Sequence, residues 1–370
     1  NTLTAGIPDA TESRYRDAGL TALHGRASFA GPNRIRCNGD VLTARKILVA
    51  AGSTPRPLNL PGGEHVLTSD DFLALDRLPE RIVFIGGGYI AAELACVAAV
   101  AGARVSLLEA GDRILPAFDA DLVGLLVRRF GGLGIRVETR ATVRAVRREA
   151  GGLRVKADRG SQFADCVVHA AGRVPDLADL DLAQGGVACD REGVAVNEHL
   201  QSRTHPDVYV AGDAHAQGVA LTPAAEAEGA LAAENMLHGN RRRWTPGHVP
   251  SVAFTLPPVA AVGMTAEAAS PDTHAVAHRD ASDRHFARRL AAGPLGYTFI
   301  VERKTGNLTG AHLLGAGAEE TINLFASAIR RGTTLAALRE QTWTFPSLAY
   351  EAIHGLPEPV PVQPAATGRT

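Results

Sequence analysis

Residues 81–113 read RIVFIGGGYIAAELACVAAVAGARVSLLEAGDR. The apolar run 81–85 is typical of a short buried β-strand, and it stops at Gly86-Gly87-Gly88. An Ala-rich segment of helical type, 89–101, follows, and a second apolar run, 104–108, reads as another strand. This order of strand, glycine turn, helix and strand predicts the opening of a βαβ unit.

The spacing Gly86-x-Gly88-x-x-Ala91 has a physical reason. The first glycine permits the tight turn, the second lets a pyrophosphate approach the backbone, and Ala91 lets helix and strand pack closely. The phosphates then contact free N–H groups at the positive end of the helix. Glu109 ends the second strand, where a carboxylate accepts hydrogen bonds from both hydroxyls of an adenosine ribose. The stretch predicts a dinucleotide site; the alternative is an Ala-rich core helix after an ordinary turn.

The length, charge and composition of the chain narrow the class of protein. A chain of 370 residues with a net charge of −1 and 45% hydrophobic residues predicts two or three soluble domains and gives no support for nucleic-acid binding. No apolar run approaches the ~20 residues of a membrane span, and no secretion signal is visible. None of the four cysteines pairs at CxxC or CxxxxC spacing, which favours core thiols in a reducing cytoplasm over a metal site.

The remaining chain alternates strands with helices. Residues 27–49 read as strands with a tight turn at Asn38-Gly39. A Pro- and Gly-rich linker predicts a domain boundary near residue 65. From Pro250 the sequence pattern predicts an α+β domain. Within this last part we expect 266–292 to be loop or partly helical, and residues 357–370 to form a disordered tail.

Two strings recur, ILVAAGSTP at 47–55 and VVHAAGRVP at 167–175. The glycine turn at Gly86 precedes the second string, and the same distance counted back from the first falls before Asn1. We therefore expect that a first nucleotide-binding βαβ unit is missing from this chain. The alternative is a chance recurrence of a short string.

Several motifs now stand in order: ILVAAGSTP, VFIGGGYIAAE, HAAGRVP, VYVAGDA, LTPAA, PSVAFTLPPVAAVG and GAHLLGAGAEETINLFASAI. Together they resemble the FAD- and NAD(P)-dependent pyridine nucleotide-disulfide oxidoreductases, which include glutathione reductase, dihydrolipoyl dehydrogenase and mercuric reductase. The resemblance implies an α/β fold with two Rossmann-like domains and a C-terminal α+β dimerisation domain. It divides the chain into an FAD domain in two segments (1–65, incomplete, and 177–245), an NAD(P) domain (66–176) and a dimerisation domain (250–356).

The same resemblance assigns residues to two cofactors. Asp213 matches the acid that holds the flavin side of FAD, and Ala51, Gly52, Leu221 and Thr222 match segments lining that cofactor; on sequence alone Asp213 also reads as a turn residue. The matched NAD(P) contacts are Gly86, Gly87, Gly88, Tyr89, Ile90, Ala91, Glu93, Glu109 and Gly172. Tyr89 resembles the tyrosine that covers the nicotinamide pocket, and Glu93 resembles the acid that pairs with a lysine near the flavin.

Departures from the family pattern bear on the chemistry. The redox pair CxxxxC is absent, and by the family layout it precedes Asn1. Phe345 stands where the family has its base, a histidine, and Tyr350 where it has the glutamate that orients it, with Glu351 one residue later. A phenylalanine cannot take a proton from a thiol, so we assign no catalytic residue.

The residues after the second strand also predict whether the chain prefers NADH or NADPH. Family members that use NADPH place arginines just after the second strand, where this chain has Ala110 and Pro116, with Arg113 near. A carboxylate about 4 Å from a 2′-phosphate repels it by roughly 4 kcal/mol at an effective dielectric of ~20, so Glu109 predicts NADH over NADPH.

The function expected is hydride transfer from NADH to FAD and on to a disulfide or another small-molecule acceptor, by a cytoplasmic homodimer without nucleic-acid or membrane partners. Residues 1–370 alone are not expected to turn over a disulfide. Two alternatives stay open: a nucleotide-binding pseudoenzyme without disulfide chemistry, and an NADH oxidase or quinone reductase.

Overall fold

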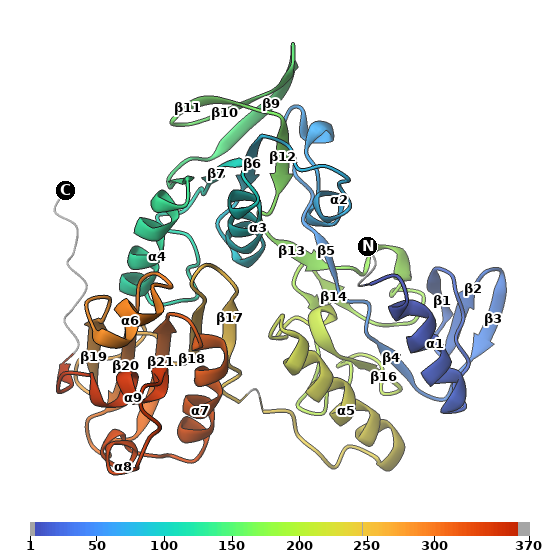
Figure 1. The fold of residues 1–370 in the computed structure, drawn as a ribbon. Coiled ribbons are helices and arrows are strands. Elements are labelled where there is room, and N and C mark those ends of the chain that lie inside the picture. Colours follow the sequence, from blue (N-terminus) through green and yellow to red (C-terminus); the bar gives the residue numbers. More distant parts are fainter. Residues whose placement is uncertain (1–3, 246, 362–370) are drawn as a thin grey trace. The chain divides into compact units, whose positions relative to one another are not determined.

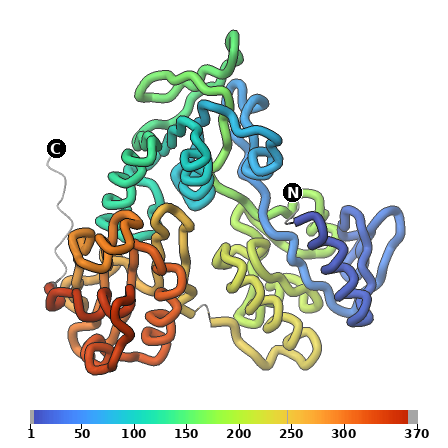
Figure 2. Tube along the Cα trace, in the orientation of Figure 1, coloured from blue at the N-terminus to red at the C-terminus, as the bar shows by residue number. Residues whose placement is uncertain are grey.

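The computed structural model describes residues 4–245 and 247–361. The chain divides into two compact units, one made of residues 1–54 and 174–245, the other of residues 55–173 and 246–370. Strands β5 (Ser53–Pro55) and β13 (Arg173–Pro175) carry the chain from one unit to the other. Each unit is therefore built from segments far apart in the sequence, as the colours of Figure 2 show.

Unit 1 begins with helix α1 (Ile7–Asp17) and the antiparallel sheet β1 (Ala27–Gly31), β2 (Arg34–Cys37) and β3 (Asp40–Thr43). Asn38 and Gly39, with φ of 51° and 90°, form the predicted tight turn between β2 and β3. Strand β4 (Ile47–Val49) pairs in parallel with β16 (Val208–Val210), and the 3₁₀ turn η3 (Gly212–Ala214) leads towards the long helix α5 (Thr222–His238). The short elements are η2 (Ala178–Leu180), β14 (Cys189–Asp190) and β15 (Gly193–Val194).

Unit 1 has its own apolar core. Val49 of β4, Val208 and Val210 of β16, and Leu231 of α5 are buried in one cluster with Phe29 of β1. This packing fixes the start of α5 against the ends of β4 and β16, where the two predicted FAD segments meet.

The first part of unit 2 is the predicted βαβ unit and its continuation. A four-stranded parallel sheet has the order β12 (Cys166–His169), β6 (Arg81–Ile85), β7 (Arg104–Leu108), β8 (Ile135–Glu138). Helices α3 (Tyr89–Val100) and α4 (Ala120–Gly132) follow β6 and β7 (Figure 1). A meander of β9 (Val143–Glu149), β10 (Gly152–Ala157) and β11 (Gly160–Ala164) extends beyond this sheet, and η1 (Gly63–His65) and α2 (Ser69–Leu73) precede it.

The second part of unit 2 is a six-stranded sheet of order β17–β18–β21–β20–β19–β22, with antiparallel pairs throughout. Its strands are β17 (Ser251–Ala253), β18 (Val259–Gly263), β19 (His274–Asp280), β20 (Gly296–Glu302), β21 (Leu308–Leu314) and β22 (Val360–Pro361). Its helices are α6 (His285–Leu290), α7 (Ala318–Arg330), α8 (Leu335–Arg339) and α9 (Leu348–His354). The expected α/β architecture with a C-terminal α+β part is confirmed.

The two parts of unit 2 share a core. Phe84 and Leu107 of the parallel sheet lie in the same buried cluster as Val259 and Leu314 of the six-stranded sheet. They form one compact body although the sequence suggests two domains.

Three boundaries differ from expectation. The first passage between units lies at Thr54, earlier than residue 65, because Leu58 and Leu60 pack against the core of unit 2. Residues 266–292, expected to be loop or partly helical, contain helix α6 as well as strand β19, whose Ala275 and Ala277 are buried on either side of half-buried Val276. The expected disordered tail begins with β22 paired to β19, whereas residues 362–370 lie outside the described residues.

Within the part of the chain that the structure describes, none of the helices is both long and apolar enough to cross a membrane.

Candidate functional site

The glycine turn after β6 has the geometry that the spacing predicts. Gly86 has a φ of +113°, and a Cβ there would come within 2.4 Å of Ala170 O, so glycine is required. A Cβ on Gly88, in contrast, would meet nothing within 4 Å. Gly88 is the N-cap of α3, and no side chain within the described residues caps it, which leaves the first N–H groups of the helix open to an anion.

Glu109 lies over this turn. It follows the end of β7, and its Oε1 accepts a hydrogen bond from the Gly111 amide at 2.6 Å. A Cβ on Gly87 would come within 2.9 Å of Glu109 Oε2. The carboxylate therefore lies beside the predicted phosphate-binding turn.

The two arginines near Glu109 have other partners. Arg113 donates to the carbonyls of Phe118 at 2.6 Å and Pro116 at 2.9 Å, and lies 3.3 Å from the Glu267 carboxylate. Arg140 pairs with Asp112 at 2.6 Å. Neither guanidinium neutralises Glu109.

The helix after the turn positions the other predicted NAD(P) residues. Ala91 is fully buried where α3 meets the sheet, and Ile90 is half-buried at the start of the helix. Tyr89 packs edge-on against Phe118, with ring centroids 5.3 Å apart. Glu93 accepts a hydrogen bond from the backbone of Phe254. Gly172, within the second repeated string and after strand β12, has a φ of +106°.

A pocket of about 460 Å³ lies in unit 1 at the carboxyl ends of β4 and β16. Four predicted FAD residues line it, namely Gly52, Asp213, Leu221 and Thr222; further lining residues are Leu48, Ala50, Ala211, Gly212, Ala220, Ala225, Glu226 and Gly229. Ala51 is exposed beside Gly52 but is not among the lining residues. The volume falls in the usual range for small-molecule sites.

Two features of this pocket suit a nucleotide. Helix α5 starts at it with Pro223 in its first turn, and none of the described side chains caps Leu221 at its N-terminus, so free N–H groups face the pocket mouth. A Cβ on Gly52, which has a φ of +69°, would meet nothing within 4 Å, which leaves room for a close ligand. The residues present therefore fit a phosphate-bearing cofactor such as FAD.

Sequence reasoning missed one polar partner here. Ser53 Oγ donates to Asp213 Oδ2 at 2.7 Å and so orients the carboxylate at the pocket. Ser53 follows Gly52 directly, and the parallel pairing of β4 with β16, which brings it to Asp213, is not visible in the sequence.

The C-terminal segment lacks the family's pairing of a base with an acid. Phe345 is 62% exposed and packs edge-on against Tyr350, which in turn packs against exposed His354, with ring centroids 5.0 and 4.6 Å apart. Glu351 points inwards, is buried and bonds Arg284 Nε at 2.8 Å. The Glu351 carboxylate raises the pKa of Arg284, which marks a structural ion pair.

The four cysteines are free in the structure, and three of them are buried. Burial raises the pKa of Cys96 and of Cys166 to about 11. Because the thiolate is the reactive form, these two side chains are poor nucleophiles near neutral pH.

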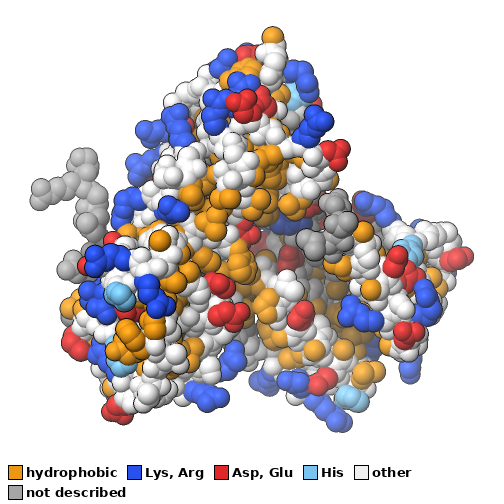
Figure 3. Space-filling model, in the orientation of Figure 1, with side chains coloured by type: hydrophobic (Ala, Val, Ile, Leu, Met, Phe, Trp, Pro, Cys, Tyr) orange, Lys and Arg blue, Asp and Glu red, His pale blue; other side chains and the backbone are white. Residues whose placement is uncertain are grey.

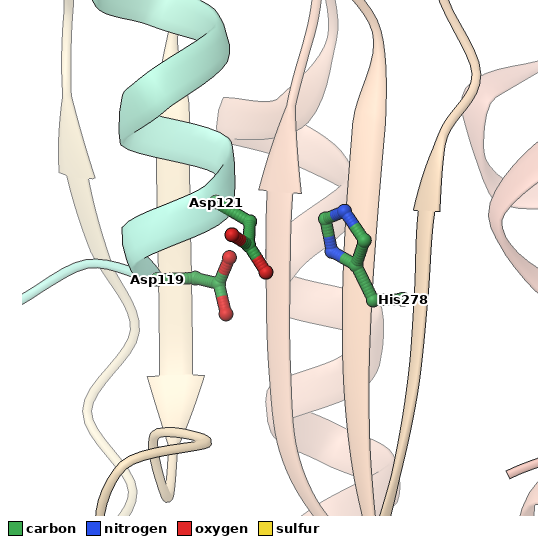
Figure 4. A group of neighbouring side chains, drawn as sticks. All are labelled: Asp119, Asp121 and His278. Carbon is green, nitrogen blue, oxygen red and sulfur yellow. The ribbon is translucent and has the colours of Figure 1, made fainter. Parts of the chain in front are cut away.

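Asp119, Asp121 and His278 bring possible metal-ligand atoms within 4.8 Å of one another, and Figure 4 shows both aspartates at the start of α4 facing the ring from β19. Two of these residues already have protein partners. Asp119 caps α4 by accepting from the Leu122 amide at 3.0 Å, and His278 Nδ1 lies 2.8 Å from Thr298 Oγ1. These contacts account for the group, and we assign it no ion.

Comparisons with known proteins agree with this geometry. The family model described as pyridine nucleotide-disulphide oxidoreductase matches residues 8–229, and the dimerisation-domain model of the same family matches residues 249–354. A glutathione reductase from Burkholderia cepacia is 32% identical over 341 residues, which cover 91% of this chain and 76% of that protein. A mercuric reductase from Bacillus cereus is 29% identical over 88% of this chain, and the match spans 52% of its length.

Among solved structures, the HOCl-induced flavoprotein disulfide reductase RclA from Escherichia coli superposes with a TM-score of 0.85 at 25% identity. The match covers 94% of this chain and 81% of that one. The chain thus spans about half of the length of the Bacillus cereus mercuric reductase and about three quarters or more of the other two proteins.

Proposed function

Because the chain belongs to the pyridine nucleotide-disulphide oxidoreductase family, whose members are oxidoreductases, we propose that it supports hydride transfer from NADH to FAD and electron transfer on to an acceptor. FAD, when bound, takes the hydride and passes two electrons onwards. The single observation that carries the proposal is the lined pocket at Gly52, Asp213 and Thr222 in a chain that also holds the Gly86–Glu109 turn.

Each unit has its own role in this proposal. In unit 1, Asp213 and the N-terminus of α5 hold FAD, with Ser53 fixing the carboxylate. In unit 2, the N–H groups at Gly88 hold the pyrophosphate of the nicotinamide nucleotide, and Glu109 binds its ribose.

NADH is the proposed donor because, among the residues that the structure describes, none of the cationic side chains pairs with Glu109 at this turn. Arg113 and Arg140 are engaged with carbonyls and with Asp112, so a 2′-phosphate would meet the carboxylate without a counter-charge. The pair of NADH and NADPH titrations therefore tests this part of the proposal.

We further propose a homodimer formed through residues 249–354, the range of the dimerisation-domain match. Exposed apolar side chains within this range support an interface; they include Phe254, Leu256 and Phe345. Figure 3 shows apolar surface over the region of α3 and β17. Light scattering at micromolar concentration should give twice the mass of the chain.

The four cysteines are free and three of them are buried, which is in keeping with a location in a reducing cytoplasm.

The acceptor separates two candidate functions. A disulfide is the substrate class suggested by the similarity to glutathione reductases. Exposed Phe345 at the position of the base favours an acceptor that needs no thiol deprotonation, such as a quinone or oxygen.

The deciding experiment is the visible absorption spectrum of the purified chain before and after NADH. We expect a flavin band that bleaches on NADH addition. A colourless protein that still binds NADH would instead favour a nucleotide-binding role without electron transfer.

A further inference from the structure

A carboxyl and an imidazole side chain are buried together beneath the Asp213 turn in unit 1. Glu228 on α5 is 0% exposed and His215 is 3% exposed. Glu228 Oε2 accepts a hydrogen bond from the Gly212 amide at 2.7 Å and lies 3.0 Å from His215 Nε2. The carboxylate thus connects the middle of α5 to the backbone of the turn.

Burying these two side chains costs free energy, which a purely structural contact would not require. A carboxylate removed from water is unfavourable unless it is paired, and replacing a buried ion pair by apolar side chains is often neutral or stabilising. The contacts within the described residues also leave Glu228 Oε1 and both ring nitrogens of His215 buried without a hydrogen-bond partner, so His215 Nε2 lies close to Glu228 Oε2 but does not hydrogen-bond to it. Apolar side chains at both 215 and 228 would fill the space without burying a carboxylate and an imidazole, so the pair points to a positional requirement.

The turn itself shows what is positioned. Gly212 has a φ of +67°, and a Cβ on it would lie 3.2 Å from the Cβ of Ala225 on α5. The Glu228 bond fixes the amide of Gly212 in this left-handed conformation. Because Asp213 is the next residue, the same bond sets the direction in which its carboxylate enters the pocket.

We propose that Glu228, with His215 as its buried counter-group, is a positioning residue that presents Asp213 to the flavin nucleotide. The inference rests on the proposed function, because FAD is the ligand proposed for this pocket. Glu228 does not line the pocket, so it acts through the turn rather than by contact with the ligand.

The test compares Glu228→Met, Glu228→Gln and Asn235→Leu in the full chain. Methionine keeps the volume without an acceptor, and glutamine keeps an acceptor for the Gly212 amide. Asn235 is the matched control, because it is also buried on α5, at 1% exposure. Its Oδ1 accepts hydrogen bonds from the backbone N–H groups of Arg241 and Arg242, near the C-terminal end of the helix. FAD affinity is measured by quenching of flavin fluorescence, beside thermal unfolding and amide exchange of the peptide containing Gly212.

We expect Glu228→Met to weaken FAD binding about tenfold or more and to speed exchange at Gly212, whereas Glu228→Gln stays within about threefold. Asn235→Leu should lower the unfolding temperature yet leave FAD affinity within about twofold. Unchanged affinity in Glu228→Met, or an equal loss in Asn235→Leu, overturns the inference. A wild-type chain that binds no FAD overturns the proposed function itself, and Gly212 exchange then still reports whether Glu228 holds the turn.

Discussion

Glu93 Oε1 accepts a hydrogen bond from the backbone N–H of Phe254, 2.9 Å away, and so joins helix α3 to strand β17. The residue next to Phe254, Ala253, is buried in the core that both parts of unit 2 share. The glycine turn at the start of α3 is therefore tied to the six-stranded sheet through one side chain.

Glu93→Ala should destabilise unit 2 by about 1–2 kcal/mol, because it leaves the Phe254 amide without this charged acceptor. Glu93→Gln keeps an acceptor and should lose less than about half of that. Urea unfolding of the two variants measures the difference; equal stability of Glu93→Ala and wild type would contradict it.

Gly86→Ala and Gly88→Ala should separate folding from binding. Alanine at 86 would clash with Ala170 O at a positive φ, so we expect a loss of more than about 2 kcal/mol of stability. Alanine at 88 has open space and should cost within about 1 kcal/mol, yet its methyl group should weaken NADH binding about tenfold. Denaturation and fluorescence titration check both; a normal NADH affinity in Gly88→Ala argues against a pyrophosphate at this turn.

Glu109→Gln should weaken NADH binding and strengthen NADPH binding, shifting the ratio of the two dissociation constants by about tenfold or more. The cause is removal of a negative charge that pairs with none of the cations in residues 4–245 and 247–361. Glu80→Gln is the control, because Glu80 is an exposed acid that pairs with Arg104, away from the turn. A shift of the same size in the control would assign the effect to net charge alone.

Asp165 predicts a pH-dependent contribution to stability. A side-chain hydrogen bond with Arg81 is the main reason that the pKa of Asp165 lies below its ordinary value. A carboxyl whose pKa is lower in the folded state stabilises the fold above its unfolded pKa, about 4, and this contribution is lost as the pH falls towards the folded value.

Asp165→Asn should therefore reduce stability at about pH 6 and narrow its difference from wild type at about pH 3. Asp158→Asn, at an exposed pair with Arg144, is the comparison and should show a smaller change. Urea midpoints at the two pH values decide it; a constant gap between wild type and Asp165→Asn would be the contrary result.

The thiols should differ in reactivity. With a pKa of about 11, buried Cys96 and Cys166 should react slowly with a thiol reagent at pH about 8, whereas exposed Cys189 should react fast. Cys189→Ser should abolish the fast phase. If Cys96 or Cys166 reacted fast in the folded chain, its burial would be wrong.

The sequence predicted local patterns well. The strand, glycine turn, helix and strand between Arg81 and Glu109 were predicted from local signals, whereas the close approach of Ala170 O that requires glycine at 86 was not visible in the sequence. The helix at α5 and the turn at Asn38-Gly39 follow from similarly local signals.

Relations between distant residues were not predictable. The Ser53–Asp213 and Gly212–Glu228 bonds depend on how β4, β16 and α5 assemble, and no spacing in the chain encodes that. Strand β19 was missed because His274, His278 and Arg279 make its surroundings polar, although Ala275 and Ala277 are its buried face. The bond between Arg284 and buried Glu351 likewise joins residues 67 positions apart.

Strand β22 has a consequence for the handling of the chain. Val360 and Pro361 pair with Val276 and Ala275 on the outer side of β19, whose other side pairs with β20 over its whole length. A chain cut before Val360 would present the uncovered N–H and C=O groups of β19 to other molecules, which is how sheets seed aggregation. The sequence alone predicts a disordered tail from residue 357, whereas Val360 and Pro361 protect part of this sheet edge from pairing with another molecule.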